Sequence, residues 1–115
     1  MRRRPDSRDG DLLGGTLDML ILRIVSTGPA HGFAIAQRIG ERSENVLLVE
    51  EGSLYPALHR LEDRGWISSA WGVSENNRKA KFYTITAHGR KQLRAESSRW
   101  ADLVAAVGRV MEQES

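Results

Sequence analysis

The chain has 115 residues, of which 28% are charged and 40% apolar, a balance typical of one soluble globular domain with a modest core. It contains no cysteine, which excludes disulfides, thiolate metal sites and a cysteine nucleophile. The formal net charge is only +2, and no apolar run is long enough to span a membrane. We therefore expect a cytoplasmic protein without a membrane partner and without a secretory signal.

Positive charge is unevenly distributed along the chain. Residues 76–95 carry six basic side chains and no acidic one, and Arg2, Arg3 and Arg4 form a second basic cluster. Such clustering favours a nucleic acid or another anionic surface as partner, although a single run of this kind also occurs in ordinary solvated loops. The six side chains are Arg78, Lys79, Lys81, Arg90, Lys91 and Arg94.

The start of the chain predicts an arm followed by a helix. Residues 1–10 are polar apart from the initial methionine and include proline and glycine, which predicts a flexible basic arm. From Thr16, the expected N-cap, apolar residues recur at spacings of three and four up to Val25, which predicts a helix. Gly28 and Pro29 are expected to end it.

A second, shorter helix is predicted after His31, ending between Gly40 and Ser43. Its apolar stripe is flanked by two polar residues, Gln37 and Arg38. A link follows whose apolar residues are expected to pack against the core. These residues are Val46, Leu47 and Val49, with Leu48 as a further candidate.

Residues 50–67, EEGSLYPALHRLEDRGWI, predict a third helix. Ser53 is its expected N-cap, so that Pro56 falls in the first turn, where a missing N–H costs no hydrogen bond. Gly52 is expected to let the chain turn sharply into the helix. A leucine-rich face is expected to be buried, and the side chains that lie off that face include Tyr55, His59 and Arg60.

The remaining sequence predicts a hairpin and a long helix. Two strand-like runs, residues 66–73 and 81–86, enclose a polar segment with two consecutive asparagines. Tyr83 lies in the second run, where we expect its ring to be half buried and its hydroxyl free for a phosphate. Thr86 is the expected N-cap of a helix over residues 87–115.

This last helix carries an apolar stripe at alternating steps of three and four residues. A lone helix of this length is rarely stable in water unless it buries such a face, so the stripe predicts the seam of a homodimer. The stripe consists of Leu93, Ser97, Trp100, Val104, Val107 and Met111.

Together these elements predict a mainly α fold with a two-stranded β-hairpin (α+β). We interpret residues 11–86 as a winged helix-turn-helix and residues 87–115 as a dimerisation helix. The third helix would enter the major groove of double-stranded DNA, and the basic hairpin suits phosphates or the minor groove. The predicted DNA contacts are Ser53, Tyr55, His59, Arg60, Gln37, Arg38, Arg78, Lys79, Lys81 and Tyr83.

Two segments, GSLYPALHRLEDRGWISSAWG and KAKFYTITAHGRKQL, closely resemble the PadR family of bacterial transcriptional regulators, and the earlier HGFAI matches as well. The resemblance covers roughly residues 12–95, and the length resembles the small subfamily with one C-terminal helix. It implies a homodimeric, sequence-specific DNA-binding repressor. We expect such a dimer to bind a pseudo-palindromic operator. Some members release DNA on binding a small aromatic compound, so Trp100 is also a candidate floor for such a ligand between protomers, as an alternative to pure packing.

Other classes of function are less well supported by the residues. There is no Ser/His/acid order, no metal-ligand spacing and no phosphate-binding loop, so we expect neither an enzyme nor a cofactor. His31, His59 and His88 are far apart in the sequence, which argues against a metal site. The alternative that stays open is a winged-helix module that binds another protein without specific DNA readout.

Overall fold

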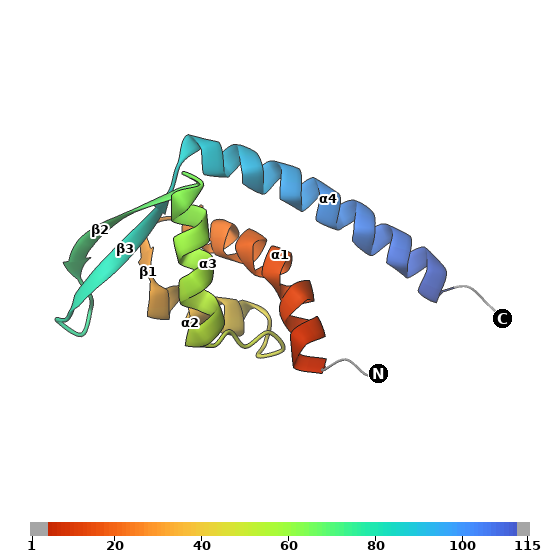
Figure 1. Cartoon of the computed structure of the whole chain (residues 1–115), viewed down its shortest axis with the longest axis horizontal. Helices are drawn as coiled ribbons and strands as arrows, with labels where there is room; N and C mark the ends of the chain where they lie inside the picture. The colour runs from red at the N-terminus through yellow and green to blue at the C-terminus, as the bar shows by residue number, and fades with distance from the viewer. Residues whose placement is uncertain (1–4, 113–115) are drawn as a thin grey trace.

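The computed structural model describes the backbone of residues 5–112 and the side chains of residues 15–112. Over this range the chain forms four helices and a small three-stranded antiparallel sheet (Figure 1). The predicted α+β class and the long last helix are confirmed, and no helix in the described range is long and apolar enough to cross a membrane. The elements are α1 (Pro5–Val25), β1 (Ala30–His31), α2 (Gly32–Arg42), α3 (Glu51–Asp63), β2 (Ile67–Val73), β3 (Lys79–Ile85) and α4 (Ala87–Met111).

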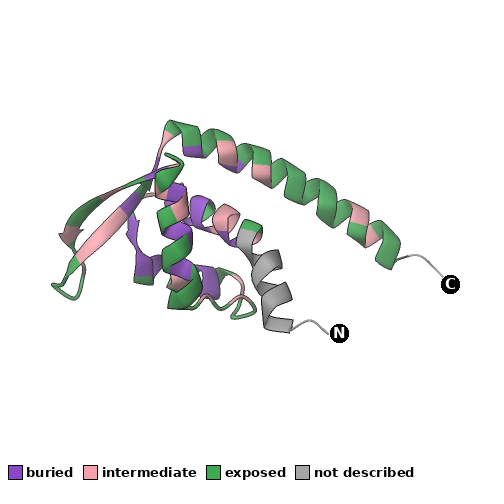
Figure 2. Cartoon of the chain, viewed as in Figure 1, coloured by how far each residue is buried: buried purple, intermediate pink, exposed green. Residues whose placement is uncertain are grey.

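One hydrophobic core holds α1, α2, α3 and the sheet together. Figure 2 shows the buried residues gathered where these helices meet and at the base of the hairpin. Each large aliphatic side chain that is fully buried there contributes about 1.5–3 kcal/mol relative to an exposed one. The largest such side chains are Ile21, Leu22, Val25, Ile35, Leu54, Leu58, Leu61 and Ile67.

Helix α1 begins earlier than the sequence pattern predicts. It starts at Pro5, so Thr16 lies inside the helix and its predicted role as N-cap is wrong. Proline is well tolerated at a first helical position, and a helix that is already fixed by a buried segment extends at little cost. Residues 5–10, expected to belong to a flexible arm, have helical backbone, whereas Arg2, Arg3 and Arg4 lie outside the described residues.

Helix α3 also begins earlier than predicted. Its N-cap is Glu50, which makes no side-chain capping bond, and the N–H of Leu54 donates to the Glu50 carbonyl at 2.9 Å. Ser53 and Gly52 therefore lie within the first turn, and their predicted roles as N-cap and sharp bend are wrong. Pro56 falls inside the helix, where it removes the hydrogen bond to the Gly52 carbonyl. Gly52 and Pro56 are both exposed, so water can donate a hydrogen bond to the Gly52 carbonyl instead.

The sheet has one strand more than predicted. Strands β2 and β3 form the expected antiparallel hairpin, and the turn between them is closed by Asn77, whose positive φ of 60° suits asparagine. The short β1 pairs with the other edge of β3, with Ala30 opposite Tyr83, so the prediction of a two-stranded sheet is corrected to three strands. A two-residue strand is too short to produce an alternating sequence pattern.

The link between α2 and α3 packs only in part as predicted. Leu47 and Val49 are half-buried against the core, whereas Val46 and Leu48 are exposed. An apolar run without regular periodicity does not determine which of its side chains face inward, and the prediction for Val46 and Leu48 is wrong for that reason.

Helix α4 is capped as predicted but only its first turns belong to the core. The Thr86 hydroxyl accepts a hydrogen bond from the N–H of Gly89 at 2.9 Å and donates one to the carbonyl of Gly65 at 2.7 Å. Leu93 is buried in the protomer's own core, so its predicted place in a free apolar stripe is wrong. Beyond this point α4 is mostly exposed (Figure 2).

Candidate nucleic-acid interface

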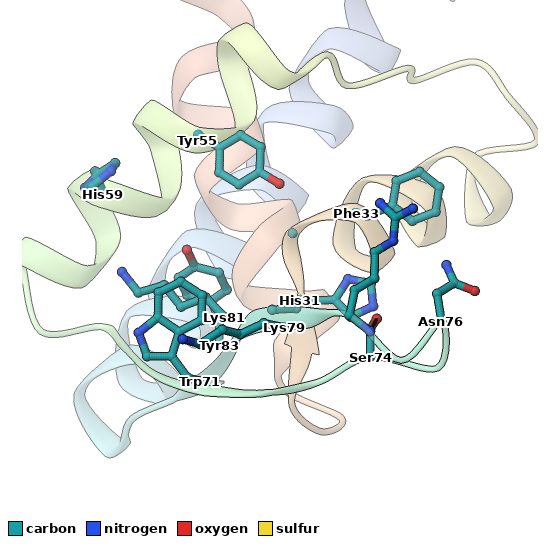
Figure 3. Close-up of a pocket in the computed structure, with 13 residues that line it drawn as sticks. His31, Phe33, Tyr55, His59, Trp71, Ser74, Asn76, Lys79, Lys81 and Tyr83 are labelled. Carbon is teal, nitrogen blue, oxygen red and sulfur yellow. Dashed lines mark hydrogen bonds between the residues drawn. The ribbon is translucent and has the colours of Figure 1, made fainter.

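A groove of about 670 Å³ lies between α3 and the β2–β3 hairpin, which we call the wing (Figure 3). Helix α3 supplies Tyr55 and His59, and the wing supplies two aromatic rings, Trp71 and Tyr83, and three Lys or Arg side chains. None of the described residues that line this α3–wing groove is acidic. The charged lining residues of the groove and its central aromatic residue are Arg78, Lys79, Lys81 and Trp71.

Tyr55 is held over the start of α2 by a close fit to a glycine. Its side chain is 40% exposed, and a Cβ built on Gly32 would lie 2.7 Å from the Tyr55 hydroxyl oxygen. Gly32 thus leaves the space in which the tyrosine ring lies. His59 follows one turn later on α3 and is exposed in the same groove. Both predicted contact residues therefore lie on one accessible face of the helix.

The basic residues of the wing surround Trp71. Lys79 and Lys81 point to the same face of β3 because they are two residues apart, and Trp71 pairs with Lys81 across the hairpin. Their Nζ atoms lie 5.3 Å and 5.9 Å from the centroid of the Trp71 ring. The Trp71 side chain is 64% exposed, and the sequence pattern did not identify it as a functional residue. The sequence feature that could have pointed to Trp71 is a tryptophan in the first strand of the hairpin, with two lysines in the second strand.

The turn of the wing is linked to α2 through His31. Its Nδ1 accepts a hydrogen bond from the N–H of Ala34 at 3.2 Å, which leaves Nε2 to donate to the Glu75 carboxylate at 3.4 Å. The pKa of Glu75 is lowered, mainly by a hydrogen bond that its carboxylate accepts from its own backbone N–H. The hydrogen bond from His31 and then the charges of His31 and Arg38 lower it further. The contact connects the wing tip to the start of α2.

Arg60 makes an ion pair that the sequence pattern does not predict. Its guanidinium donates to the carboxylate of Asp18 on α1 at 2.6 Å, and Arg64 lies 3.8 Å from the same carboxylate. This side chain joins α3 to α1 while 41% of it stays exposed, so its predicted contact with DNA stays a prediction. A sequence pattern places Arg60 off the leucine face but does not show which neighbouring helix approaches it.

Tyr83 is buried more deeply than predicted. Its side chain is only 6% exposed and belongs to the hydrophobic core, but it also lines the α3–wing groove, so its contact with a phosphate stays a prediction. Burial, and then the negative charge of Glu62, raise the pKa of Tyr83. The two charged or polar neighbours that act on its hydroxyl, Glu62 and Tyr55, both belong to α3, so this helix lies close to the ring.

The other predicted contacts lie on the surface. Ser53 is exposed on the first turn of α3, and Gln37 and Arg38 are exposed on α2. Gln37 lines a second hollow of about 830 Å³ between α2 and the start of α3. This second hollow includes the three glutamates Glu41, Glu50 and Glu51, so the two hollows differ in charge.

The far part of α4 carries most of the predicted stripe on its surface. Trp100 is 44% exposed and borders a third hollow of about 500 Å³ between α1 and α4. Ser97, Val104, Val107 and Met111 are exposed as well, together with Leu103 and Val110. Except for Leu93, the stripe is uncovered in the single chain.

Comparison with known proteins agrees with this arrangement. The model of the transcriptional regulator PadR-like family matches residues 21–95. A Lysinibacillus sphaericus protein described only as uncharacterized is 31% identical over 102 residues, which cover 89% of this chain and 94% of that protein.

Solved structures resemble the whole fold. A PadR-like transcriptional regulator from Bacillus cereus is 28% identical with a TM-score of 0.77, covering 90% of this chain and 99% of that one. A PadR family regulator from Eggerthella lenta is 30% identical with a TM-score of 0.76, covering 95% of this chain and 93% of that one. These neighbours are transcriptional regulators and not enzymes. The chain therefore belongs to the PadR-like family of transcriptional regulators, which implies regulation of transcription through DNA binding.

Proposed function

We propose that the protein is a cytoplasmic, homodimeric repressor that binds a pseudo-palindromic operator through α3 and the wing of each protomer. The observation that carries this proposal is the α3–wing groove, in which exposed Tyr55 and His59 face a wing with three Lys or Arg side chains and no described lining residue is acidic. A surface of this charge attracts phosphates, and the exposed side chains of α3 are free to contact base edges.

The exposed stripe of α4 supports the homodimer. Val104 and Val107 are each about half exposed, and neighbouring apolar side chains widen the stripe. A soluble protein rarely leaves such a continuous apolar face open to water, so a second copy of the chain is its natural cover. Two protomers joined in this way would present two reading helices to successive major grooves, about one helical turn apart.

The hollow beside Trp100 supports release of DNA by a small aromatic effector. Its lining combines an accessible indole ring with Met19 and Leu103 and with two charged residues, Glu96 and Arg99. In a variant whose other tryptophans, Trp66 and Trp71, are replaced by phenylalanine, aromatic compounds should quench the Trp100 fluorescence. Unchanged emission across a broad panel of aromatic compounds would argue for a repressor without such an effector.

Substitutions in the groove test the DNA-reading role. Tyr55→Ala should weaken binding to the operator more than binding to a random duplex, because it removes a side chain that contacts a base. Lys79→Met should weaken both about equally and lower the slope of log K against log salt by about one, the amount expected for a single phosphate neutralised by a lysine. Fluorescence anisotropy with labelled duplexes over a series of salt concentrations measures both effects.

A basic residue remote from the groove provides the matched control. Arg109 lies near the far end of α4, and Arg109→Met should leave affinity and slope unchanged. If Tyr55→Ala leaves operator affinity untouched, the assignment of the reading face is wrong. A weak salt dependence of the wild-type protein, without preference for any duplex, would instead favour a winged-helix module that binds proteins.

A further inference from the structure

Trp71 is a large aromatic side chain that the fold itself does not use. It lies on β2, an edge strand of the sheet, and 64% of it is exposed, whereas the core is built from other residues. Its ring faces the α3–wing groove rather than open solvent on the outside of the wing (Figure 3). An exposed tryptophan beside a groove is a common sign of a binding contact.

The charges around this ring indicate what kind of partner it would meet. Lys79 and Lys81 both have their Nζ atoms beside the ring, at 5.3 Å and 5.9 Å from its centroid. Two ammonium groups held beside one ring repel each other unless an anion lies nearby, and no carboxylate is among the described residues that line the groove. The groove is therefore suited to a partner that alternates anionic and apolar parts over a short distance.

The backbone of DNA has this alternation. When α3 lies in a major groove and the wing lies over the adjacent minor groove, the strand that separates the two grooves passes between them. In a duplex the flat faces of the bases are covered by their neighbours, so the apolar surface that this strand offers to a ring is the deoxyribose. Phosphates lie on either side of each sugar.

We propose that Trp71 packs against a deoxyribose of the strand that passes between α3 and the wing, while Lys79 and Lys81 bind the phosphates beside it. This inference rests on the proposed DNA-binding function and adds a contact to it. The contact recognises the backbone of DNA and carries no base sequence, because every nucleotide presents the same sugar. It therefore tightens binding to any duplex.

The substitution Trp71→Ala tests this contact in the full-length protein. Affinity should fall at least about tenfold for the operator and for a random duplex alike, a reduction equivalent to about 1.4 kcal/mol. The salt slope should stay the same because no charge is removed, whereas Lys81→Met should lower it. Val73→Ala is the matched control: this residue is also exposed on β2 but does not line the groove, and its truncation should leave affinity unchanged.

Several outcomes would overturn the contact. Unchanged affinity of Trp71→Ala would do so, and so would a salt slope that falls as much as in Lys81→Met, which would mean that the ring only positions the lysines. If the protein binds single-stranded DNA more tightly than duplex DNA, and this binding depends on Trp71, the ring stacks on bases instead of packing against a sugar. If the wild-type protein binds no duplex at all, the proposed function fails and this inference fails with it. If the wild-type protein binds duplex DNA but Trp71→Ala binds equally well, only this inference fails.

A second measurement does not depend on the stability of the alanine variant. When Trp66→Phe and Trp100→Phe leave Trp71 as the single tryptophan, its emission should shift to shorter wavelength on addition of duplex DNA, because the ring leaves water. Emission that stays unchanged while anisotropy reports binding would contradict the contact.

Discussion

Asp18 joins α3, the proposed DNA-reading helix, to α1 through a carboxylate that is only 14% exposed. It accepts from Arg60 at 2.6 Å and has Arg64 at 3.8 Å, so two cations from α3 and its C-cap converge on one acceptor of α1. Removing the charge leaves both guanidinium groups without their anion in a partly buried place. This ion pair orients α3 relative to the core that carries it.

Asp18→Asn should lower the free energy of unfolding by about 1–3 kcal/mol, since the amide oxygen can still accept from Arg60 but the attraction of a largely buried carboxylate for two guanidinium groups is lost. Urea unfolding at neutral pH measures the change. The pair of Glu96 with Arg99 has a similar length of 2.7 Å but lies on the surface of α4, so Glu96→Gln should cost less than about 0.5 kcal/mol. Equal decreases in the two variants would show that burial does not strengthen the Asp18 pair.

Single residues were the least predictable level from sequence. Tyr55 and His59 were placed on an accessible face by helical periodicity alone, and the structure agrees. The deep burial of Tyr83 is not predictable from local spacing because it involves contact with α3. The ion pair of Arg60 is not predictable because its partner lies on another helix. Local spacing carries no information about such distant contacts.

Elements were predicted better than their ends. The three-four spacing of buried residues identified α1, α2 and α3, and the two polar asparagines identified the turn of the wing. The starts of α1 and α3 were missed because capping-type residues, Thr16 and Ser53, occur inside the helices. A potential cap shows where a helix can begin, and the neighbouring backbone decides where it does.

The exposed face of α4 is the element on which the proposed dimerisation would depend. Val107→Glu would bring a charge into the centre of the stripe, and we expect it to shift the protein from dimer to monomer because a desolvated carboxylate has no partner there. Sedimentation velocity at micromolar concentration measures this. Ser98 lies on the opposite side of the same helix, so Ser98→Glu should leave the dimer intact. A dimer that survives Val107→Glu would place the interface elsewhere.

In the whole molecule, the α3–wing groove and the far end of α4 lie at different places, with α4 leading away from the wing (Figure 1). DNA binding and dimerisation can therefore use separate surfaces of one small chain. The hollow beside Trp100 lies between α1 and α4, and α1 is also the helix that Asp18 ties to α3. A compound bound in that hollow would contact the helix to which α3, the proposed reading helix, is tied.

The most direct test of the proposed function is hydroxyl-radical footprinting of the purified protein on the DNA upstream of its own gene. A homodimer that inserts α3 of each protomer should protect two segments on one face of the duplex, about one helical turn apart, at the same protein concentration. A single protected segment, or uniform protection along the DNA, would contradict paired reading of a pseudo-palindromic operator.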